Sequence, residues 1–303
     1  MKRIFAALLC ALAAFSLTAC GTENSSSAPE SAASSNGAVS SSSAVSSVEN
    51  IFSEVSAADE KTELKSLVLL GDSIATGCML PDYEPGNNYS APLSFGNMLG
   101  AEFESYKNFA VDGRTTEELL SSLEADDAEL SEALSSADVI VISIGGNDFL
   151  QPMITAIRND ETLDYLFEES GGELSDEDFR KALDASLEAA KAVDVSITFD
   201  NIGKCAAKIT EINPTTKIIL MTVYDPFSGS EELKAASDVA REKLTVLNFG
   251  LSSLGGGNIG VIDVYAEFDG AAEKLTNIGS MDIHPNSDGH YRIYRLLKKQ
   301  LGI

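Results

Sequence analysis

Ser73 is the residue of this sequence best placed to act as a nucleophile. It follows a short apolar run and opens a helical stretch, so we expect a strand to end and a helix to begin here. A serine hydroxyl is a weak nucleophile unless an imidazole nearby takes its proton. The chain has two histidines, His284 and His290, so a histidine base must be one of them.

Acyl transfer also requires hydrogen-bond donors for the negative oxygen of the tetrahedral intermediate. The backbone N–H of Ser73 is one candidate, because the first N–H groups of a helix lack helical acceptors and the helix dipole favours an anion there. Gly113 offers a second N–H, since glycine lets the backbone approach a substrate closely. The side-chain amide of Asn147 offers a third. One such donor typically contributes ~3 kcal/mol of transition-state stabilisation.

Apolar runs and helical stretches alternate along the chain from Leu64 onward. The runs that indicate buried strands are Ser66–Gly71, Phe103–Ala110, Asp138–Gly145, Lys217–Tyr224 and Gly260–Val264. Helical patterns lie at 89–99, 115–135, 202–212, 231–251 and 291–301. This order predicts an α/β fold with a parallel sheet covered by helices on both faces.

Polar blocks follow these expected strands. They are Gly71-Asp72-Ser73, Asn108–Gly113, Gly145-Gly-Asn147-Asp148, Tyr224-Asp225-Pro226 and Asp282–Asn286. In open α/β sheets, sites form beyond the carboxyl ends of the strands, so these blocks are expected to converge.

Four of these blocks, in this order, resemble the SGNH or GDSL-type hydrolase family. They are Gly71-Asp72-Ser73, Gly113, Gly145-x-Asn147-Asp148 and His284-Pro285, and the resemblance covers about 64–303. It implies a flavodoxin-like, three-layer α/β/α fold and hydrolysis of acyl esters with no metal or other cofactor. It also implies that Ser73 is the nucleophile and His284 the base, with Ser73 N–H, Gly113 N–H and Asn147 as the oxyanion hole. The stretch Val223–Phe227 is similar to a segment of bacterial lipase-like lipoproteins in this family.

The acid of the triad departs from the family pattern. Many members carry it three residues before the histidine, where this chain has Met281, whereas Asp282 lies two residues before. Asp282 can reach His284 from an extended segment or from a turn. The alternative is that a backbone carbonyl orients His284, which would leave a Ser73–His284 dyad.

Other polar residues near the blocks have structural interpretations. Asp72 is expected to cap the helix after Ser73, Asp148 to hold the loop carrying Asn147, and His290 to pack or cap. The sequence Gly255–Gly260 fits a dinucleotide fingerprint but precedes a strand, so it is interpreted as a loop. Cys78 and Cys205 either pair with each other or remain as buried thiols.

The N-terminus is interpreted as a lipoprotein signal over residues 1–19. Lys2 and Arg3 precede an apolar stretch that is too short to span a bilayer. The following Leu-Thr-Ala-Cys resembles a bacterial lipobox, which implies that Cys20 is lipidated. The alternative is an ordinary signal peptide cleaved near Ala19. We therefore expect a protein anchored in the cell membrane by lipid and exposed outside the cytoplasm, at the cell surface or in the periplasm.

Two segments follow the signal peptide. Residues 20–60 are rich in Ser and Ala and are expected to form a disordered tether. Residues 61–303 are the expected hydrolase domain, with a helical, acidic insertion at about 151–200. Within it, Ser175 and Asp178 have the spacing of a capping box.

The charge balance excludes one class of partner. The chain has 21 Lys and Arg against 47 Asp and Glu, a net charge of −26, so a nucleic-acid partner is not expected. The expected substrate is a small-molecule, glycan or lipid ester. Two other classes stay open: a substrate-binding lipoprotein of a transporter, and a catalytically inactive relative acting as a surface protein.

Overall fold

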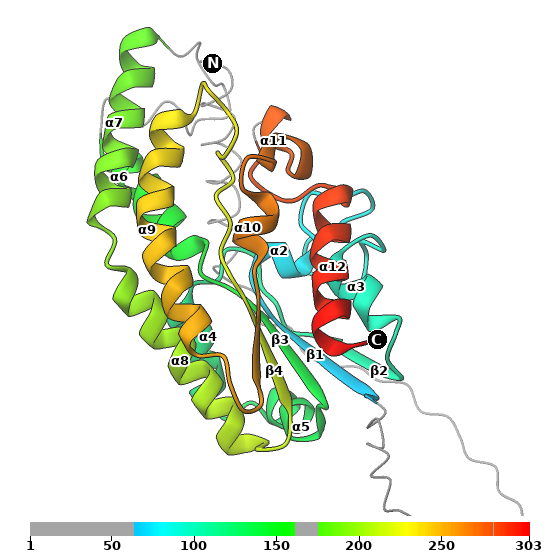
Figure 1. Ribbon diagram of the computed structural model, residues 1–303. Helices are drawn as coiled ribbons and strands as arrows, with labels where there is room; N and C mark the ends of the chain where they lie inside the picture. The colour runs from blue at the N-terminus through cyan, green and yellow to red at the C-terminus, as the bar shows by residue number, and fades with distance from the viewer. Residues whose placement is uncertain (1–63, 161–174, 281) are drawn as a thin grey trace, which may run out of the picture. The chain divides into compact units, whose positions relative to one another are not determined.

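The folded region is built on five parallel strands in the order β2-β1-β3-β4-β5 (Figure 1). A computed structural model describes residues 64–160, 175–280 and 282–303. Residues 1–63 lie outside the described residues, and they include the predicted signal peptide, Cys20 and the expected tether at 20–60. Met281 also lies outside them. The strands are β1 (Ser66–Gly71), β2 (Ser105–Asn108), β3 (Val139–Ser143), β4 (Lys217–Met221) and β5 (Ile259–Ile262).

Helices connect these strands in every crossover. In chain order they are α2 (Ser73–Thr76), α3 (Phe95–Gly100), α4 (Thr116–Glu124), α5 (Ala128–Ser136), α6 (Asn147–Arg158), α7 (Asp176–Ala192), α8 (Val195–Ile212), α9 (Lys234–Ser253), α10 (Val264–Phe268), α11 (Ala272–Leu275) and α12 (Ser287–Leu301). A short 3₁₀ helix, η2 (Ile278–Ser280), precedes the segment that carries His284. Parallel strands require such crossovers, because a tight turn can only join antiparallel neighbours.

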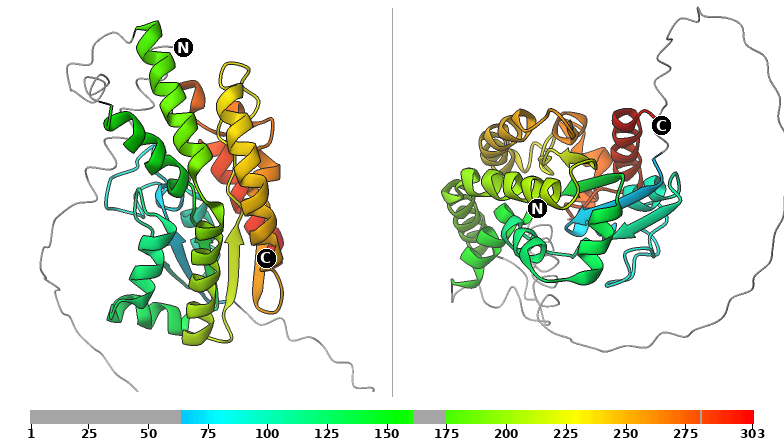
Figure 2. Two further views of the ribbon diagram at one scale, coloured as in Figure 1. Left: turned by 90° about the vertical axis from the view of Figure 1, so that its left-hand side faces the viewer. Right: turned by 90° about the horizontal axis from the view of Figure 1, so that it is seen from below.

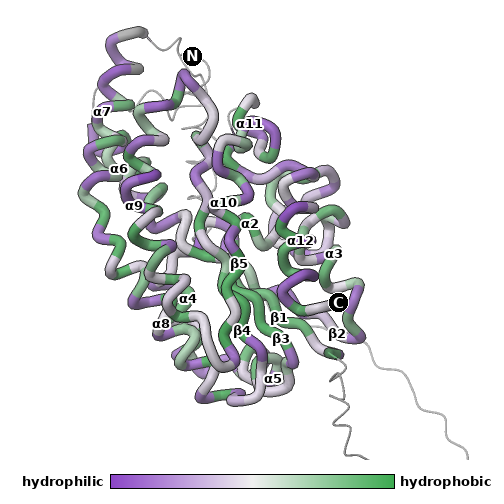
Figure 3. Tube along the Cα trace, viewed as in Figure 1, coloured by the Kyte–Doolittle hydropathy of each residue, from purple (hydrophilic) through white to green (hydrophobic). Residues whose placement is uncertain are grey.

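Alternation of side chains along the strands produces two separate cores. Val68 and Leu70 of β1 pack into a cluster with residues of α4, α5, α8 and α9. Leu67 and Leu69 point to the opposite face and pack with residues of α3, α10 and α12. Figure 2 shows helices on both faces of the sheet, and Figure 3 shows the strands as the most hydrophobic part of the fold. The predicted three-layer α/β/α fold is confirmed.

Two predicted helices have different limits in the structure. The pattern at 89–99 yields a helix only from Phe95, because Pro92 disfavours a helix through it and the Ser94 hydroxyl accepts from Asn97 N–H as the cap. The pattern at 115–135 is divided into α4 and α5. Asp127 caps α5 by accepting from the N–H groups of its first turn.

The helix predicted over 202–212 begins earlier, at Val195, where the Asp194 carboxylate accepts from Ser196 N–H. The expected insertion at 151–200 therefore comprises most of α6, all of α7 and the first part of α8, together with residues 161–174, which lie outside the described part. Ser175 caps α7 through Asp178 N–H, at 3.0 Å.

Cys78 and Cys205 are both free and fully buried. Cys205 belongs to the core beneath α8, where burial raises the pKa of its thiol to about 12. The structure therefore supports the second alternative, two buried thiols.

Candidate active site

Ser73 lies where the strand order reverses. From β1 the chain passes to β2 on one side and then crosses to β3 on the other, so the carboxyl ends of β1 and β3 open a crevice between them. At the end of β1, a Cβ on Gly71 would lie 2.2 Å from the carbonyl oxygen of Ser143, so only glycine fits this close approach. Asp72 N–H then donates to Ser143 O at 3.2 Å and fixes the start of α2.

A continuous hydrogen-bonded chain links Ser73, His284 and Asp282. Ser73 Oγ lies 2.9 Å from His284 Nε2, and His284 Nδ1 lies 2.5 Å from Asp282 Oδ1. All three side chains are buried or nearly so. With the proton on Nδ1, the neutral imidazole donates to the carboxylate and accepts from the serine hydroxyl, which is the arrangement of a nucleophile, a base and an orienting acid.

The Asp282 carboxylate is held in a turn rather than in an extended segment. Its Oδ1 also accepts from His284 N–H at 3.2 Å, and its Oδ2 accepts from Asn277 Nδ2 at 3.2 Å. Burial alone would raise the pKa of this carboxyl. The hydrogen bonds from His284 and Asn277 and the electrostatic interaction with His284 outweigh burial, so the pKa lies below its ordinary value. The carboxylate is thus present as an anion facing the imidazole.

The loop after β4 packs against the segment that carries His284. Tyr224 OH donates to Ile283 O at 2.7 Å, and its ring packs on Phe268. Asp225 turns this loop by accepting from Phe227 N–H at 2.9 Å and from the Ser237 hydroxyl. The predicted polar block at 224–226 therefore positions the loop against the His284 segment.

Asn147 is the first residue of α6 and faces the same pocket as Ser73 and His284. One N–H of its amide donates to Arg114 O at 3.0 Å, which leaves the second N–H for another acceptor. Asp148 accepts from Thr116 N–H at 3.1 Å and from the Thr116 hydroxyl at 2.5 Å, so it ties the start of α6 to the start of α4. This agrees with the prediction that Asp148 holds the loop of Asn147.

Gly113 is fixed beside the pocket by α6. Its φ of +76° is the left-handed conformation that favours glycine, whereas a Cβ there would contact nothing within 4 Å. Its carbonyl accepts from Gln151 Nε2 at 2.9 Å. Among the described residues, Gly113 is not one of those that line the pocket. The structure thus brings Ser73, Asn147 and His284 to one cavity and places Gly113 on a loop hydrogen-bonded to Asn147's helix.

A hydrogen-bonded cluster of Asp112, Thr76 and Tyr83, which the sequence did not reveal, also holds the Gly113 loop. Asp112 accepts from the Thr76 hydroxyl at 2.6 Å and from the Tyr83 hydroxyl. These contacts join α2 and the segment after it to the loop. The only signal in the sequence is that Asp112 directly precedes Gly113.

Asp72 both caps α2 and lines the pocket. Its carboxylate accepts from Ile74 N–H at 3.0 Å, as predicted for a cap. Burial raises the pKa of this carboxyl to about 7, although the Ile74 N–H and the electrostatic interaction with His284 act in the opposite direction.

His290 packs in the core, as expected. It is fully buried, its ring stacks on Phe95 with centroids 5.8 Å apart, and its Nδ1 accepts from Phe95 N–H at 3.2 Å. The histidine that contacts Ser73 is therefore His284, whereas His290 is surrounded by core residues.

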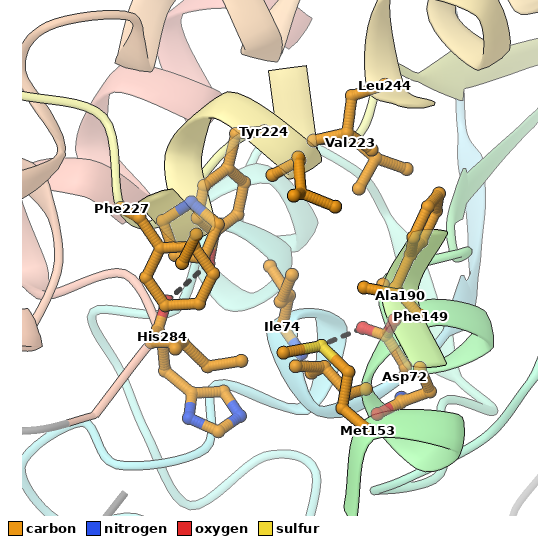
Figure 4. Close-up of a pocket in the computed structure, with 18 of the residues that line it drawn as sticks. Asp72, Ile74, Phe149, Met153, Ala190, Val223, Tyr224, Phe227, Leu244 and His284 are labelled. Carbon is orange, nitrogen blue, oxygen red and sulfur yellow. Dashed lines mark hydrogen bonds between the residues drawn. The ribbon is translucent and has the colours of Figure 1, made fainter. Parts of the chain in front are cut away.

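The pocket beside Ser73 holds about 790 Å³ of empty space, part of it open to solvent. Its polar wall consists of Asp72, Ser73, Asn147 and His284 at one end. The remaining wall is mainly apolar and comes from α6, α7, α9 and the loop after β4. Figure 4 shows Phe149, Met153 and Ala190 across the cavity from Tyr224, Phe227 and His284.

Comparison with known proteins agrees with this geometry. Residues 69–292 match the GDSL-like Lipase/Acylhydrolase family, which is more than half of the chain. The chain belongs to this family. The chain is also similar to the "Uncharacterized protein YpmR" of Bacillus subtilis (strain 168), with 22% identity over 258 residues that cover 82% of this chain and 88% of the relative.

Solved structures show the same fold. The lipase Lip_vut3 from a goat rumen metagenome superposes with a TM-score of 0.54 and 24% identity, over 78% of this chain and 97% of the lipase. An extracellular lipase from Streptomyces rimosus gives a TM-score of 0.54 at 17% identity, over 78% of this chain and 99% of the lipase. This GDSL-like chain therefore has the fold of its family from β1 to α12.

Proposed function

We propose that this protein is a serine ester hydrolase in which Ser73, His284 and Asp282 carry out acyl transfer. His284 Nε2 takes the proton of the Ser73 hydroxyl as Ser73 Oγ attacks the ester carbonyl. The negative oxygen that forms is stabilised by the N–H groups of Ser73 and Gly113 and by the amide of Asn147. His284 then gives its proton to the leaving alcohol, and an acyl ester of Ser73 remains.

The second half of the reaction uses the same groups. His284 removes a proton from a water molecule as it attacks the acyl ester; His284 then gives this proton to Ser73 Oγ as the bond from Oγ to the acyl carbon breaks, which releases the carboxylic acid and free Ser73. Asp282 stabilises the imidazolium in both halves through its contact with Nδ1. This role for Asp282 is proposed in preference to a backbone carbonyl, because a charge-assisted hydrogen bond is about twice as strong as a neutral one.

The observation that carries the proposal is the contact of 2.9 Å between Ser73 Oγ and His284 Nε2, in a pocket shared with Asn147. A substrate-binding lipoprotein does not require a serine hydroxyl within hydrogen-bond distance of an imidazole. An inactive relative does not require a carboxylate such as Asp282 to orient that imidazole. Hydrolysis of p-nitrophenyl acetate or butyrate by the wild type, and its loss in a folded Ser73→Ala variant, tests the proposal. Equal turnover by both proteins would refute it.

We also propose that the protein acts outside the cytoplasm, anchored to the membrane by a lipid on Cys20. This rests on the positive and apolar start of the sequence and on the Leu-Thr-Ala-Cys motif. Within residues 64–160, 175–280 and 282–303, no helix is long and apolar enough to cross a membrane.

A further inference from the structure

The apolar part of the pocket is lined by side chains of α6, α7 and α9 that take no part in the proposed acyl transfer. Phe149 and Met153 project from α6, Ala190 from α7, and Ala240 and Leu244 from α9. Figure 4 shows Ala190, Leu244 and Val223 around the part of the cavity that lies away from His284. The cavity therefore has more space than the ester group held by the four polar residues at its end would fill.

We propose that this cavity holds the acyl chain of a fatty acyl ester, and that Ala190 and Ala240 determine how long a chain it accepts. The inference rests on the proposed esterase function and specifies the substrate class for the same site. Alanine has the smallest side chain that a helix commonly presents, so at these two positions it leaves the space between α7 and α9 open. A larger residue at either position would occupy that space.

The chemistry of the wall argues against an acetylated sugar as the group bound inside the cavity. Sugar hydroxyls lose water when they are enclosed and need hydrogen-bond partners in return. Away from the polar end, the wall offers the Tyr224 hydroxyl, which already donates to Ile283 O. An acetyl group alone would fill the polar end and leave the apolar wall uncovered. A hydrocarbon chain covers that wall and gains its transfer free energy.

The order of the reaction favours the acyl chain over an alcohol chain as the occupant. The acyl group stays attached to Ser73 through both halves of the reaction, whereas the alcohol must depart before water attacks. A chain enclosed between α6, α7 and α9 suits the group that remains. An alcohol held there would obstruct the entry of water to the acyl ester.

The test compares p-nitrophenyl acetate, butyrate and octanoate with the full-length protein. For the wild type we expect kcat/KM to rise from acetate to octanoate by roughly fourfold per enclosed methylene. Ala240→Phe and Ala190→Phe should lower kcat/KM for octanoate by about a hundredfold, because the new ring displaces several methylenes. Both variants should lower acetate hydrolysis far less than octanoate hydrolysis, since the acetyl group reaches only the polar end. If one of these two variants does not fold, the other still tests the proposal.

Matched controls are available on the same helices. Ala235 of α9 and Ala192 of α7 are exposed, so Ala235→Phe and Ala192→Phe introduce the same ring outside the cavity. These controls should retain the wild-type preference for octanoate. If folded Ala240→Phe and Ala190→Phe keep that preference, or lose acetate and octanoate equally, the assignment of the cavity is wrong.

Two further measurements separate the ways in which the idea can fail. Octyl acetate carries the chain on the alcohol side, and its hydrolysis in preference to ethyl octanoate would overturn the assignment to the acyl group. Octanoate binding to the Ser73→Ala protein, followed by calorimetry, needs no turnover. If Ala240→Phe weakens octanoate binding and Ala235→Phe does not, the acyl site is supported even if the protein hydrolyses no ester. If the protein hydrolyses esters but both variants bind octanoate equally well, only the acyl site is refuted.

Discussion

Asp282 holds the His284 ring in one orientation. Its carboxylate contacts both Nδ1 and the backbone N–H of His284, so the ring is oriented with Nε2 toward Ser73. Asn277 in turn holds the other carboxylate oxygen. The histidine is therefore set by a local turn, which compensates for the absence of an acid at position 281.

We predict that Asp282→Asn lowers kcat by about ten-thousandfold, against about a millionfold for His284→Ala. The asparagine keeps the shape but loses the charge that stabilises the imidazolium, so the acid limb of the pH–rate profile should also move to lower pH. Steady-state kinetics between pH 5 and pH 9 would measure both effects. A near wild-type kcat with an unmoved profile would assign the orienting role to the backbone.

At the scale of elements, α6 connects the candidate oxyanion hole to the rest of the fold. Its first residue is Asn147, and one turn later Gln151 donates to the carbonyl of Gly113. On its other side the Gly113 loop is fastened through Asp112 to Thr76 and Tyr83. Two backbone donors and one amide thus depend on hydrogen bonds between elements that are distant in the sequence.

We predict that Gln151→Leu lowers kcat by about tenfold to a hundredfold and leaves KM nearly unchanged, because a displaced donor matters mainly in the transition state. Thr155→Leu, an exposed change on the same helix, is the control and should behave as wild type. A rise in KM with unchanged kcat in Gln151→Leu would show that the residue contacts substrate instead of orienting Gly113.

Helix α12 carries a buried histidine that makes stability depend on pH. Burial lowers the pKa of His290 to about 3, from an ordinary value of 6.5. Between these values the unfolded chain binds a proton that the folded protein excludes, so stability is present above about pH 6.5 and is lost as pH falls toward 3. The loss approaches about 1.4 kcal/mol per pH unit within this window.

We expect His290→Gln, which keeps an acceptor for Phe95 N–H, to remove this dependence. Urea unfolding of wild type and variant at pH 8 and pH 5 gives the comparison. The wild type should lose more stability than the variant between the two pH values, and the difference between them isolates His290 from Asp72 and other groups that titrate in this range. An equal loss in both proteins would contradict the account.

The elements also show what the sequence could and could not reveal. Strand ends were predictable because β1 and β3 lie in continuous apolar runs that are closed by Gly71 and by Gly145, two residues after β3, and this placed Ser73 and Asn147 at one edge of the sheet. The start of α3 was missed because apolar spacing continued through Pro92, although Ser94 was a readable cap. The contact of Gln151 with Gly113 depends on packing between separate segments, which no local pattern encodes.

The residues that line the cavity could not be predicted from the sequence either. Residues 151–200 were recognised as a helical insertion, but nothing in their spacing indicated that Ala190 of α7 and Ala240 of α9 would line the same pocket. Such contacts depend on how whole helices pack. The chemistry of the site was therefore predicted from motifs, whereas the shape that selects a substrate required the structure.

For the whole molecule, the proposed anchor determines where the hydrolase works. We predict that Cys20→Ala moves the protein from the membrane fraction to the soluble fraction of cells, because one acyl-bearing cysteine is its only proposed attachment. Mass spectrometry of the wild-type N-terminus should show the added lipid. Unchanged membrane retention together with an unmodified N-terminus would refute lipidation and favour cleavage near Ala19.

The central claim is that Ser73 is a nucleophile activated by His284, and covalent labelling tests it most directly. A serine-directed fluorophosphonate should modify the full-length protein once, at Ser73, with loss of esterase activity in step with labelling. His284→Ala should label far more slowly, since the hydroxyl then lacks its base. Labelling at another serine, or equal rates in wild type and His284→Ala, would contradict the account.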